Sequence, residues 1–188
     1  MKNEEILHII SQIKAGDSNA FAQLVDTYKD MVYSLCLKMT NSTENAEEIA
    51  QDSFVKAFQG LQRFKGKAKF STWLYQITYY TCINFLRKNK LDTSDVPLEN
   101  FEDNSAEILD QIQQTERREY ISKAMAYLSP TERALITFYY LEERTIKEIA
   151  IITKMSIANV KVKLHRTRKK LYGKLELLLK NEVNSLVD

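Results

Sequence analysis

The stretch TIKEIAIITKMSIANVKVKLHRTR, residues 145–168, predicts two short helices joined by a tight turn. Thr145 and Glu148 form a capping box, in which a hydroxyl and a carboxylate satisfy free amides at the start of the first helix. Ser156 is a favourable N-cap for the second helix. The turn falls at Lys154, where a residue other than glycine is acceptable only if its backbone angles stay unstrained.

The second of these helices is strongly basic. Residues 149–174 contain eight Lys or Arg and no Asp or Glu. Val160, Leu164 and Leu171 form its apolar side, and polar side chains occupy the remaining surface. A one-sided charge run beside a tight turn is typical of a helix-turn-helix whose second helix enters the DNA major groove. A basic surface helix, or one that contacts RNA or an acidic protein, is the alternative.

The composition of the whole chain favours a helical protein. Its 188 residues include only four Gly and two Pro, and Leu, Ile, Lys, Glu and Ala are abundant. The net charge of +2 hides an uneven distribution. Basic residues gather at 63–69, 87–90 and 154–174, whereas acidic residues gather at 44–52 and 92–119. This distribution predicts separate basic and acidic working surfaces.

Several classes of protein are disfavoured by the sequence. The N-terminus MKNEEILHIISQIKAG contains acidic residues and lacks the long apolar run of a signal peptide. No window reaches the ~18 to 20 apolar residues that a membrane span needs. Cys36 and Cys82 lie in apolar helical patterns, which favours packed free thiols over a disulfide or metal pair. We expect a cytoplasmic protein without a metal site, a cofactor or membrane insertion.

The N-terminal half reads as a series of helices. A short amphipathic helix ends near Gly16, and Asp17 can cap the next helix, which continues through about Lys38. After the polar break at residues 40–43 comes a helix with an acidic start and apolar side chains on several faces. Its carboxylates stabilise a helix N-terminus, or they form part of a surface for a partner protein.

Residues 60–72 resemble a loop in which lysines alternate with aromatic side chains. Phe64 and Phe70 flank the lysines, a pattern that suits single-stranded nucleic acid because bases stack and phosphates pair with cations. A solvated basic loop is the alternative. A helix follows from Thr72 through Lys88.

The composition changes again over LDTSDVPLENFEDNS, residues 91–105, which has several carboxylates and no Lys or Arg. This segment predicts a flexible acidic linker between two helical halves. In the second half, Ser129 and Glu132 form another capping box. The helix that they begin is expected to carry Leu135, Phe138, Tyr139 and Leu141 into the core beneath the helix-turn-helix.

Three blocks of the sequence resemble a known family. The first is AEEIAQDSFVKAF (46–58), and the second is FSTWLYQIT with INFLRK (within 70–88). The third is LSPTERALI with IKEIA and VKVKLHRTRKKL (within 128–171). With these blocks the sequence resembles the bacterial sigma-70 family, specifically the extracytoplasmic-function type. The resemblance implies an all-α protein with two small domains, a σ2 helical bundle at 1–91 and a σ4 helix-turn-helix at 115–188. An acidic linker at 92–114 joins them and would thread through the polymerase channel.

The resemblance also assigns roles to residues. The acidic helix would bind the β′ clamp helices of core RNA polymerase through Glu47, Glu48, Gln51, Asp52 and Phe54. The loop and the following helix would melt and read the −10 promoter element through Lys65, Lys67, Lys69, Ser71, Trp73, Tyr75, Tyr79, Tyr80, Asn84, Arg87 and Lys88. The second domain would read the −35 element through Ser156, Asn159, Lys161, Lys163, His165, Arg166 and Lys169.

The implied function is promoter recognition and promoter melting by RNA polymerase, with no catalytic residue in this chain. The implied partners are core polymerase (β′ and β), promoter DNA and an anti-sigma factor, which is membrane-bound in proteins of this type. Two positions depart from the family pattern: Tyr80 stands where Asn is common, and Lys154 stands where Gly is common. The competing function is a stand-alone helix-turn-helix repressor or activator, which would leave the acidic helix and the lysine loop unused.

Overall fold

The structure is a computed structural model that describes the backbone of residues 2–89 and 114–185, with side chains described at 2–89 and 119–179. The described residues form helices joined by short turns and contain no strand. The predicted all-α fold is therefore confirmed. The predicted linker at 92–114 lies outside the described residues except for Gln114, and the exact domain boundaries remain predictions.

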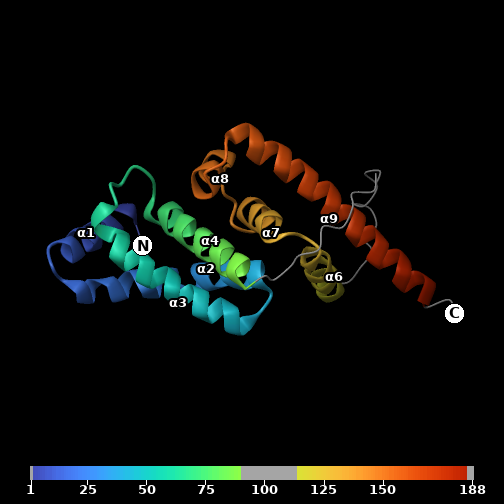
Figure 1. Cartoon of the computed structure of the whole chain (residues 1–188), viewed down its shortest axis with the longest axis horizontal. Helices are drawn as coiled ribbons and strands as arrows, with labels where there is room; N and C mark the ends of the chain where they lie inside the picture. The colour runs from blue at the N-terminus through green and yellow to red at the C-terminus, as the bar shows by residue number, and fades with distance from the viewer. Residues whose placement is uncertain (1, 90–113, 186–188) are drawn as a thin grey trace.

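The N-terminal half is a helical bundle (Figure 1). Its elements are α1 (Asn3–Lys14), the 3-10 turn η1 (Ser18–Ala20), α2 (Phe21–Thr40), α3 (Thr43–Gly60), the 3-10 turn η2 (Leu61–Arg63) and α4 (Phe70–Lys88). Both α3 and α4 pack against α2 and against each other. Val32, Leu35 and Met39 lie on one side of α2 at helical spacing and are fully buried.

Local signals place the breaks between these helices. Asp17 accepts hydrogen bonds from the amides of Asn19 and Ala20, so it caps η1. The helix α2 ends before Asn41, which adopts a left-handed conformation with φ of 54°. The Ser42 hydroxyl then accepts the Asn45 amide and caps α3. The predicted polar break at residues 40–43 is thus confirmed. The start of α4 differs slightly from the prediction, because this helix begins at Phe70, two residues before Thr72.

The C-terminal half contains the predicted helix-turn-helix. Its elements are α6 (Gln114–Ala126), α7 (Pro130–Ile136), the π-helical segment η3 (Thr137–Leu141), α8 (Ile146–Thr153) and the long α9 (Ile157–Ser185). Both predicted capping boxes are present, Ser129 with Glu132 and Thr145 with Glu148. In Figure 1, α9 runs diagonally along the outer side of α7 and α6, and each of these helices packs against it.

The π-helical segment corrects one expectation about the core. Leu135 and Phe138 are fully buried as predicted, but Tyr139 and Leu141 are exposed by 39% and 55%. The Glu142 amide bonds to the Thr137 carbonyl five residues earlier, which marks the wider turn. An α-helical spacing no longer describes the register after Thr137. For that reason Tyr139 and Leu141 lie on the solvent side of the chain.

The two halves share one core rather than standing apart. Buried residues of both halves form a continuous hydrophobic cluster. The helix α4 lies between the N-terminal bundle and the pair α7 and α8 (Figure 1). Contacts between α2 and α7 extend this interface. The position of α4 therefore determines which predicted DNA-contacting side chains reach solvent.

Both cysteines are buried free thiols, which confirms that they pack in the core. The Cys82 Sγ lies 3.7 Å from the Cys36 Sγ, across the contact between α4 and α2. The hydrogen bond with Cys36 and burial raise the pKa of the Cys82 thiol well above its ordinary value. The thiol therefore stays protonated and is a weak nucleophile. No helix in the described part of the chain combines the length and the apolar composition that a bilayer crossing requires.

The capping carboxylate Glu132 makes the stability of the C-terminal half depend on pH. It accepts the Ser129 amide at 2.7 Å and the Lys170 ammonium of α9 at 3.1 Å. Burial alone would raise the pKa of Glu132, but the hydrogen bonds and ion pair outweigh burial and lower it. A lowered folded-state pKa means that the stabilisation is complete above the unfolded value of about 4.3 and is lost as the pH falls through the folded pKa.

We therefore expect Glu132→Gln to reduce the free energy of unfolding at pH 7 by roughly 0.5–1 kcal/mol, because glutamine keeps the cap but loses the ion pair. Its stability should also fall less steeply with acid below about pH 4.3 than that of the wild type. Urea unfolding across pH 3–7 measures both effects. Glu119→Gln removes a solvent-exposed ion pair with Lys123 and is the control. Parallel pH curves for Glu132→Gln and wild type would contradict the assignment.

Candidate nucleic-acid and polymerase interface

The helix-turn-helix is formed by α8, a turn and α9. The Thr145 and Ser156 hydroxyls cap the two helices by accepting the amides of Glu148 and Asn159 at 3.2 Å each. Lys154 occupies the turn with φ of 54° and ψ of 25°. This is the left-handed region, so the requirement for an unstrained backbone at Lys154 is not met. A side chain with a Cβ is disfavoured in that conformation.

All seven residues predicted to read the −35 element are exposed. They are Ser156, Asn159, Lys161, Lys163, His165, Arg166 and Lys169. Val160, Leu164 and Thr167 are buried on the opposite side of α9. The helix therefore divides into a buried apolar face and a basic solvent face, as the sequence predicts.

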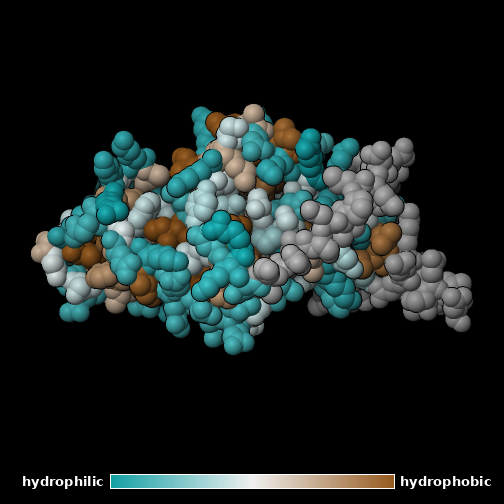
Figure 2. Space-filling view, viewed as in Figure 1, coloured by the Kyte–Doolittle hydropathy of each residue, from teal (hydrophilic) through white to brown (hydrophobic). Residues whose placement is uncertain are grey.

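Val162 is an exposed residue of this helix that the sequence analysis did not single out. Val162 lies four residues before Arg166, on the solvent side, with 48% of its surface exposed. Figure 2 shows hydrophobic surface at the top of the view, where α8 and the start of α9 lie, and Ile151 and Ile157 are also exposed there. An apolar side chain among basic ones can contact a thymine methyl group, so base recognition does not depend on cationic and polar side chains alone.

The lysine loop is anchored at both ends. Lys65, Lys67 and Lys69 are exposed. Phe64 and Phe70 are buried, with ring centroids 5.8 Å apart, and both rings also contact Trp73. The expectation that these two phenylalanines alternate with the lysines as base-stacking platforms is therefore wrong, because both rings belong to the core.

Two further contacts fix the start of this loop. The Lys14 ammonium of α1 donates to the Phe64 carbonyl at 2.7 Å. The Phe64 amide donates to the Leu61 carbonyl at 3.0 Å. Gly66 follows with φ of 68°, a conformation that glycine adopts without strain. Lys14 is therefore a positioning residue for the loop that the sequence analysis did not identify.

The other residues predicted to contact the −10 element differ in exposure. Asn84, Arg87 and Lys88 are exposed at the end of α4. Ser71, Trp73 and Tyr80 are half-buried. Tyr75 and Tyr79 are buried, and burial raises the pKa of both phenols. In this conformation of the chain, the rings of Tyr75 and Tyr79 cannot reach DNA, because α7 and η3 cover them.

The predicted polymerase-contacting residues gather on α3. Glu47, Glu48, Gln51 and Asp52 are exposed, and Phe54 is half-buried. The next turn adds an apolar patch, with Val55 exposed by 53% and Phe58 by 41%, in line with the apolar side chains that the sequence places on several faces of this helix. The Phe21 ring lies 5.0 Å from the Phe58 ring and 6.5 Å from the Phe54 ring. Acidic and apolar surfaces are therefore adjacent along one helix.

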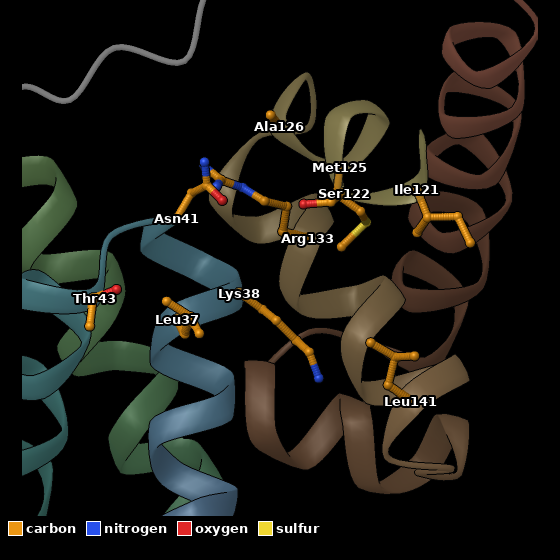
Figure 3. Close-up of a pocket in the computed structure, with 10 residues that line it drawn as sticks. All are labelled: Leu37, Lys38, Asn41, Thr43, Ile121, Ser122, Met125, Ala126, Arg133 and Leu141. Atoms are coloured by element: carbon orange, nitrogen blue, oxygen red, sulfur yellow. The ribbon is translucent and has the colours of Figure 1, made fainter. Parts of the chain in front are cut away.

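A cleft of about 480 Å³ lies between α2 and α6, beside the contact of α2 with α7 (Figure 3). Its apolar lining includes Leu37, Met125 and Leu141, and Lys38 lies at the α2 side. Arg133 also lines the cleft, and its buried Nε has no hydrogen-bond partner among the described residues. Burial lowers the pKa of the Arg133 guanidinium below its ordinary value. The cleft combines apolar walls with cationic groups.

Comparison with known proteins identifies both halves. The family description "Sigma-70 region 2" matches residues 24–91, and "Sigma-70, region 4" matches residues 118–171. The "ECF RNA polymerase sigma factor SigW" of Bacillus subtilis is 34% identical over 176 residues, which cover 88% of this chain and 94% of that protein. The chain belongs to the extracytoplasmic-function sigma factors of the sigma-70 family.

A second relative agrees with this membership, and two solved structures have a similar fold. The "ECF RNA polymerase sigma-E factor" of Escherichia coli is 28% identical to this sigma factor over 184 residues, covering 92% of this chain and 95% of the relative. CnrH, solved with the cytosolic domain of CnrY, has a TM-score of 0.63 at 21% identity and covers 90% and 96% of the two chains. RpoE of Bartonella quintana, solved with the anti-sigma factor NepR, has the same TM-score at 20% identity and covers 83% and 96%. At this identity both structures support the fold alone.

The anchor of the lysine loop leads to a test. Lys14→Met removes the hydrogen bond to the Phe64 carbonyl and should speed amide exchange at residues 65–69 by up to about tenfold, the equivalent of ~1.4 kcal/mol. Hydrogen–deuterium exchange followed by mass spectrometry measures the change. Lys29→Met removes an exposed lysine of α2 that pairs with Asp26, and it should leave the loop unchanged. Equal loop exchange in both variants would show that Lys14 does not hold the loop.

Proposed function

We propose that this sigma factor contacts a −35 promoter element through α9, a −10 element through the lysine loop and α4, and core RNA polymerase through α3. The observation that carries the proposal is the surface of α9, where all seven predicted −35 contacts are exposed on one basic helix. The exposed carboxylates of α3 lie on a different element. The two surfaces leave room for DNA and polymerase to bind at the same time.

The solvent face of α9 suits duplex DNA. Lys161, Lys163 and Lys169 neutralise phosphates and position the helix, since contacts to phosphate carry no sequence information. Asn159 and Arg166 have side chains that form paired hydrogen bonds with adenine and guanine edges. Val162 adds the apolar contact that a thymine methyl group requires. Base contacts by these three residues would set the −35 sequence preference.

The lysine loop and α4 suit an unpaired strand. Lys65, Lys67 and Lys69 would supply cations for its phosphates, and the half-buried rings of Trp73 and Tyr80 in α4 would supply surfaces for its bases. Each base that is stacked or held in a pocket returns ~1–3 kcal/mol against the cost of strand separation. The sigma factor would therefore favour the melted promoter by trapping bases, without any catalytic group of its own.

Core polymerase and an anti-sigma factor are the protein partners that we propose. The acidic and apolar surface of α3 would dock on the β′ clamp helices, and the C-terminal half would approach β. The CnrH and RpoE structures contain CnrY and the anti-sigma factor NepR, which supports a comparable partner for this chain. We place the protein in the cytoplasm, where polymerase acts.

A stand-alone helix-turn-helix regulator is the competing function. Such a protein binds intact duplex tightly by itself, commonly as a dimer on a palindrome. A sigma factor should give promoter-specific transcription only together with core polymerase. Co-purification with core enzyme, followed by run-off transcription on genomic fragments, distinguishes a sigma factor from a stand-alone regulator. The same assay provides a promoter for the tests below.

The promoter contacts predict two separable defects. Arg166→Ala should weaken −35-dependent transcription by roughly tenfold, as expected when one good base contact worth about 1–3 kcal/mol is lost. Lys67→Ala should retain −35 protection but slow promoter opening severalfold. Footprinting reports the first defect and permanganate reactivity of unpaired thymines reports the second. Lys147→Ala, an exposed lysine of α8, is the charge-matched control. Wild-type values for both variants would refute these assignments.

The proposed polymerase surface predicts a defect in holoenzyme assembly. Reversing Glu47 and Glu48 to lysine should weaken binding to core enzyme by about tenfold or more, because like charges at an interface cost several kcal/mol. Competition against a labelled wild-type sigma factor measures the affinity. The same reversal at Glu4 and Glu5 of α1 changes the net charge equally and serves as the control. If the two double variants compete equally well, α3 is not the docking surface.

A further inference from the structure

One face of α4 is turned toward the C-terminal half instead of solvent. Tyr75 and Tyr79 lie one helical turn apart, as do Gln76 and Tyr80, so the four side chains form two adjacent rows. Figure 1 shows α4 beside α7 and α8, and the packing of these helices agrees. Three of the four residues belong to the proposed −10 surface.

The row formed by Gln76 and Tyr80 caps the end of α8. The last four carbonyls of an α-helix have no partner within that helix. The Gln76 Nε2 donates to the Ile151 carbonyl at 2.6 Å, and the Tyr80 hydroxyl donates to the Thr153 carbonyl at 2.9 Å. Both carbonyls belong to the final turn of α8, which ends at Thr153. The first helix of the helix-turn-helix is thus capped by a side-chain pair from the other half.

Lys154 reinforces the same contact. Its ammonium lies 5.1 Å from the centre of the Tyr80 ring, within the range of a cation–π interaction. A cation at this place also faces the negative end of the α8 dipole. The left-handed backbone at Lys154 is unfavourable for any residue with a Cβ. The contact with Tyr80 gives lysine a role at this turn that glycine cannot fill.

The row formed by Tyr75 and Tyr79 is buried in the interface. The Tyr75 hydroxyl donates to the Glu142 carboxylate, and the Arg144 guanidinium lies 5.1 Å from the centre of the Tyr75 ring. The Phe138 ring packs edge-on against Tyr75 at 5.3 Å. Tyr79 contacts the same phenylalanine. Buried rings with a charged hydrogen bond make this a specific contact between the halves.

We propose that the Tyr80–Lys154 contact and the Gln76 cap form a latch that keeps the free sigma factor closed and covers its −10 surface. Single-stranded DNA would bind only to the minor fraction of open molecules, so its apparent affinity falls in proportion to that fraction. Core polymerase would favour the open form if it binds that form better. The claim that the latch covers a −10 surface rests on the proposed function. The claim that the latch holds the two halves together does not depend on it.

Two matched glycine variants test the latch. Lys154→Gly and Glu143→Gly each relieve a left-handed residue in the same half, with φ of 54° and 48°, but only Lys154 contacts Tyr80. Small-angle X-ray scattering of the full chain should show a larger radius of gyration for Lys154→Gly and no change for Glu143→Gly. Gln76→Ala opens the latch from the other side and should also increase the radius.

A second measurement connects opening with DNA. The probe is a fluorescent single strand that carries the non-template −10 region of a promoter transcribed by the holoenzyme. Without core polymerase, Lys154→Gly should bind it about threefold to tenfold more tightly than wild type or Glu143→Gly, in line with the strength of a cation–π contact. Run-off transcription by the Lys154→Gly holoenzyme should be retained, which shows that the variant is folded.

The outcomes separate the two proposals. If Lys154→Gly, Gln76→Ala and Glu143→Gly all scatter like wild type and bind the single strand with wild-type affinity, there is no latch, whatever the transcription assays show. If Lys154→Gly and Gln76→Ala expand but DNA affinity does not change, the halves open without uncovering a DNA surface, and the covering role is overturned. Expansion together with tighter DNA binding supports both parts of the latch.

Discussion

The fold depends on the amount of apolar surface that α4 has to bury. Its buried side chains include Phe70, Leu74, Tyr75, Tyr79 and Cys82, which spread over about half of the helix circumference. A helix that is apolar on several faces needs neighbours on several sides. The helices α2 and α3 cover one side, and α7 with α8 covers another. Because α4 serves both packings, the two halves of the sigma factor are joined through it.

The sequence was most informative where structure is local. Capping boxes at Ser129 and Thr145, the cap at Ser156 and the basic face of α9 depend on residues within one or two helical turns, and all are present. The burial of Phe64 was not predictable in this way. Its environment comes from Phe70 and Trp73 of the next helix, so an alternation of lysine and phenylalanine could not show which rings face solvent.

The exposure of Tyr139 and the burial of Tyr75 both depend on structure that no local pattern shows. The π-helical turn at Thr137 changes the register of the chain, so Tyr139 faces solvent although α-helical spacing placed it in the core. Tyr75 was assigned to DNA by resemblance, and its ring is covered by Phe138 and Arg144 from a segment more than sixty residues away in sequence. No local pattern contains that information.

The two promoter-reading surfaces consequently differ in access. Arg166 and the other predicted −35 contacts are exposed, whereas Tyr79 on the proposed −10 surface is buried between the halves. A chain in this conformation presents the helix that we propose for duplex DNA but covers part of the surface that we propose for a single strand. That order would match the order of initiation, in which duplex DNA must be located before it is melted. On this proposal, the free protein would have little means of trapping unpaired bases away from a promoter.

The turn at Lys154 shows how this asymmetry is maintained. Glycine would adopt φ of 54° without strain, yet the chain has lysine at this position. Lys154 and Tyr80 are the two departures from the family pattern noted in the sequence. The two residues contact each other across the interface. A cation–π contact of about 0.5–2 kcal/mol is comparable with the cost of ~1–2 kcal/mol for a left-handed residue, so the contact with Tyr80 can offset the backbone cost of lysine at this turn. Lys154 therefore adds to the contact between the halves through the Tyr80 ring, beside the hydrogen bond that the Tyr80 hydroxyl donates to the Thr153 carbonyl.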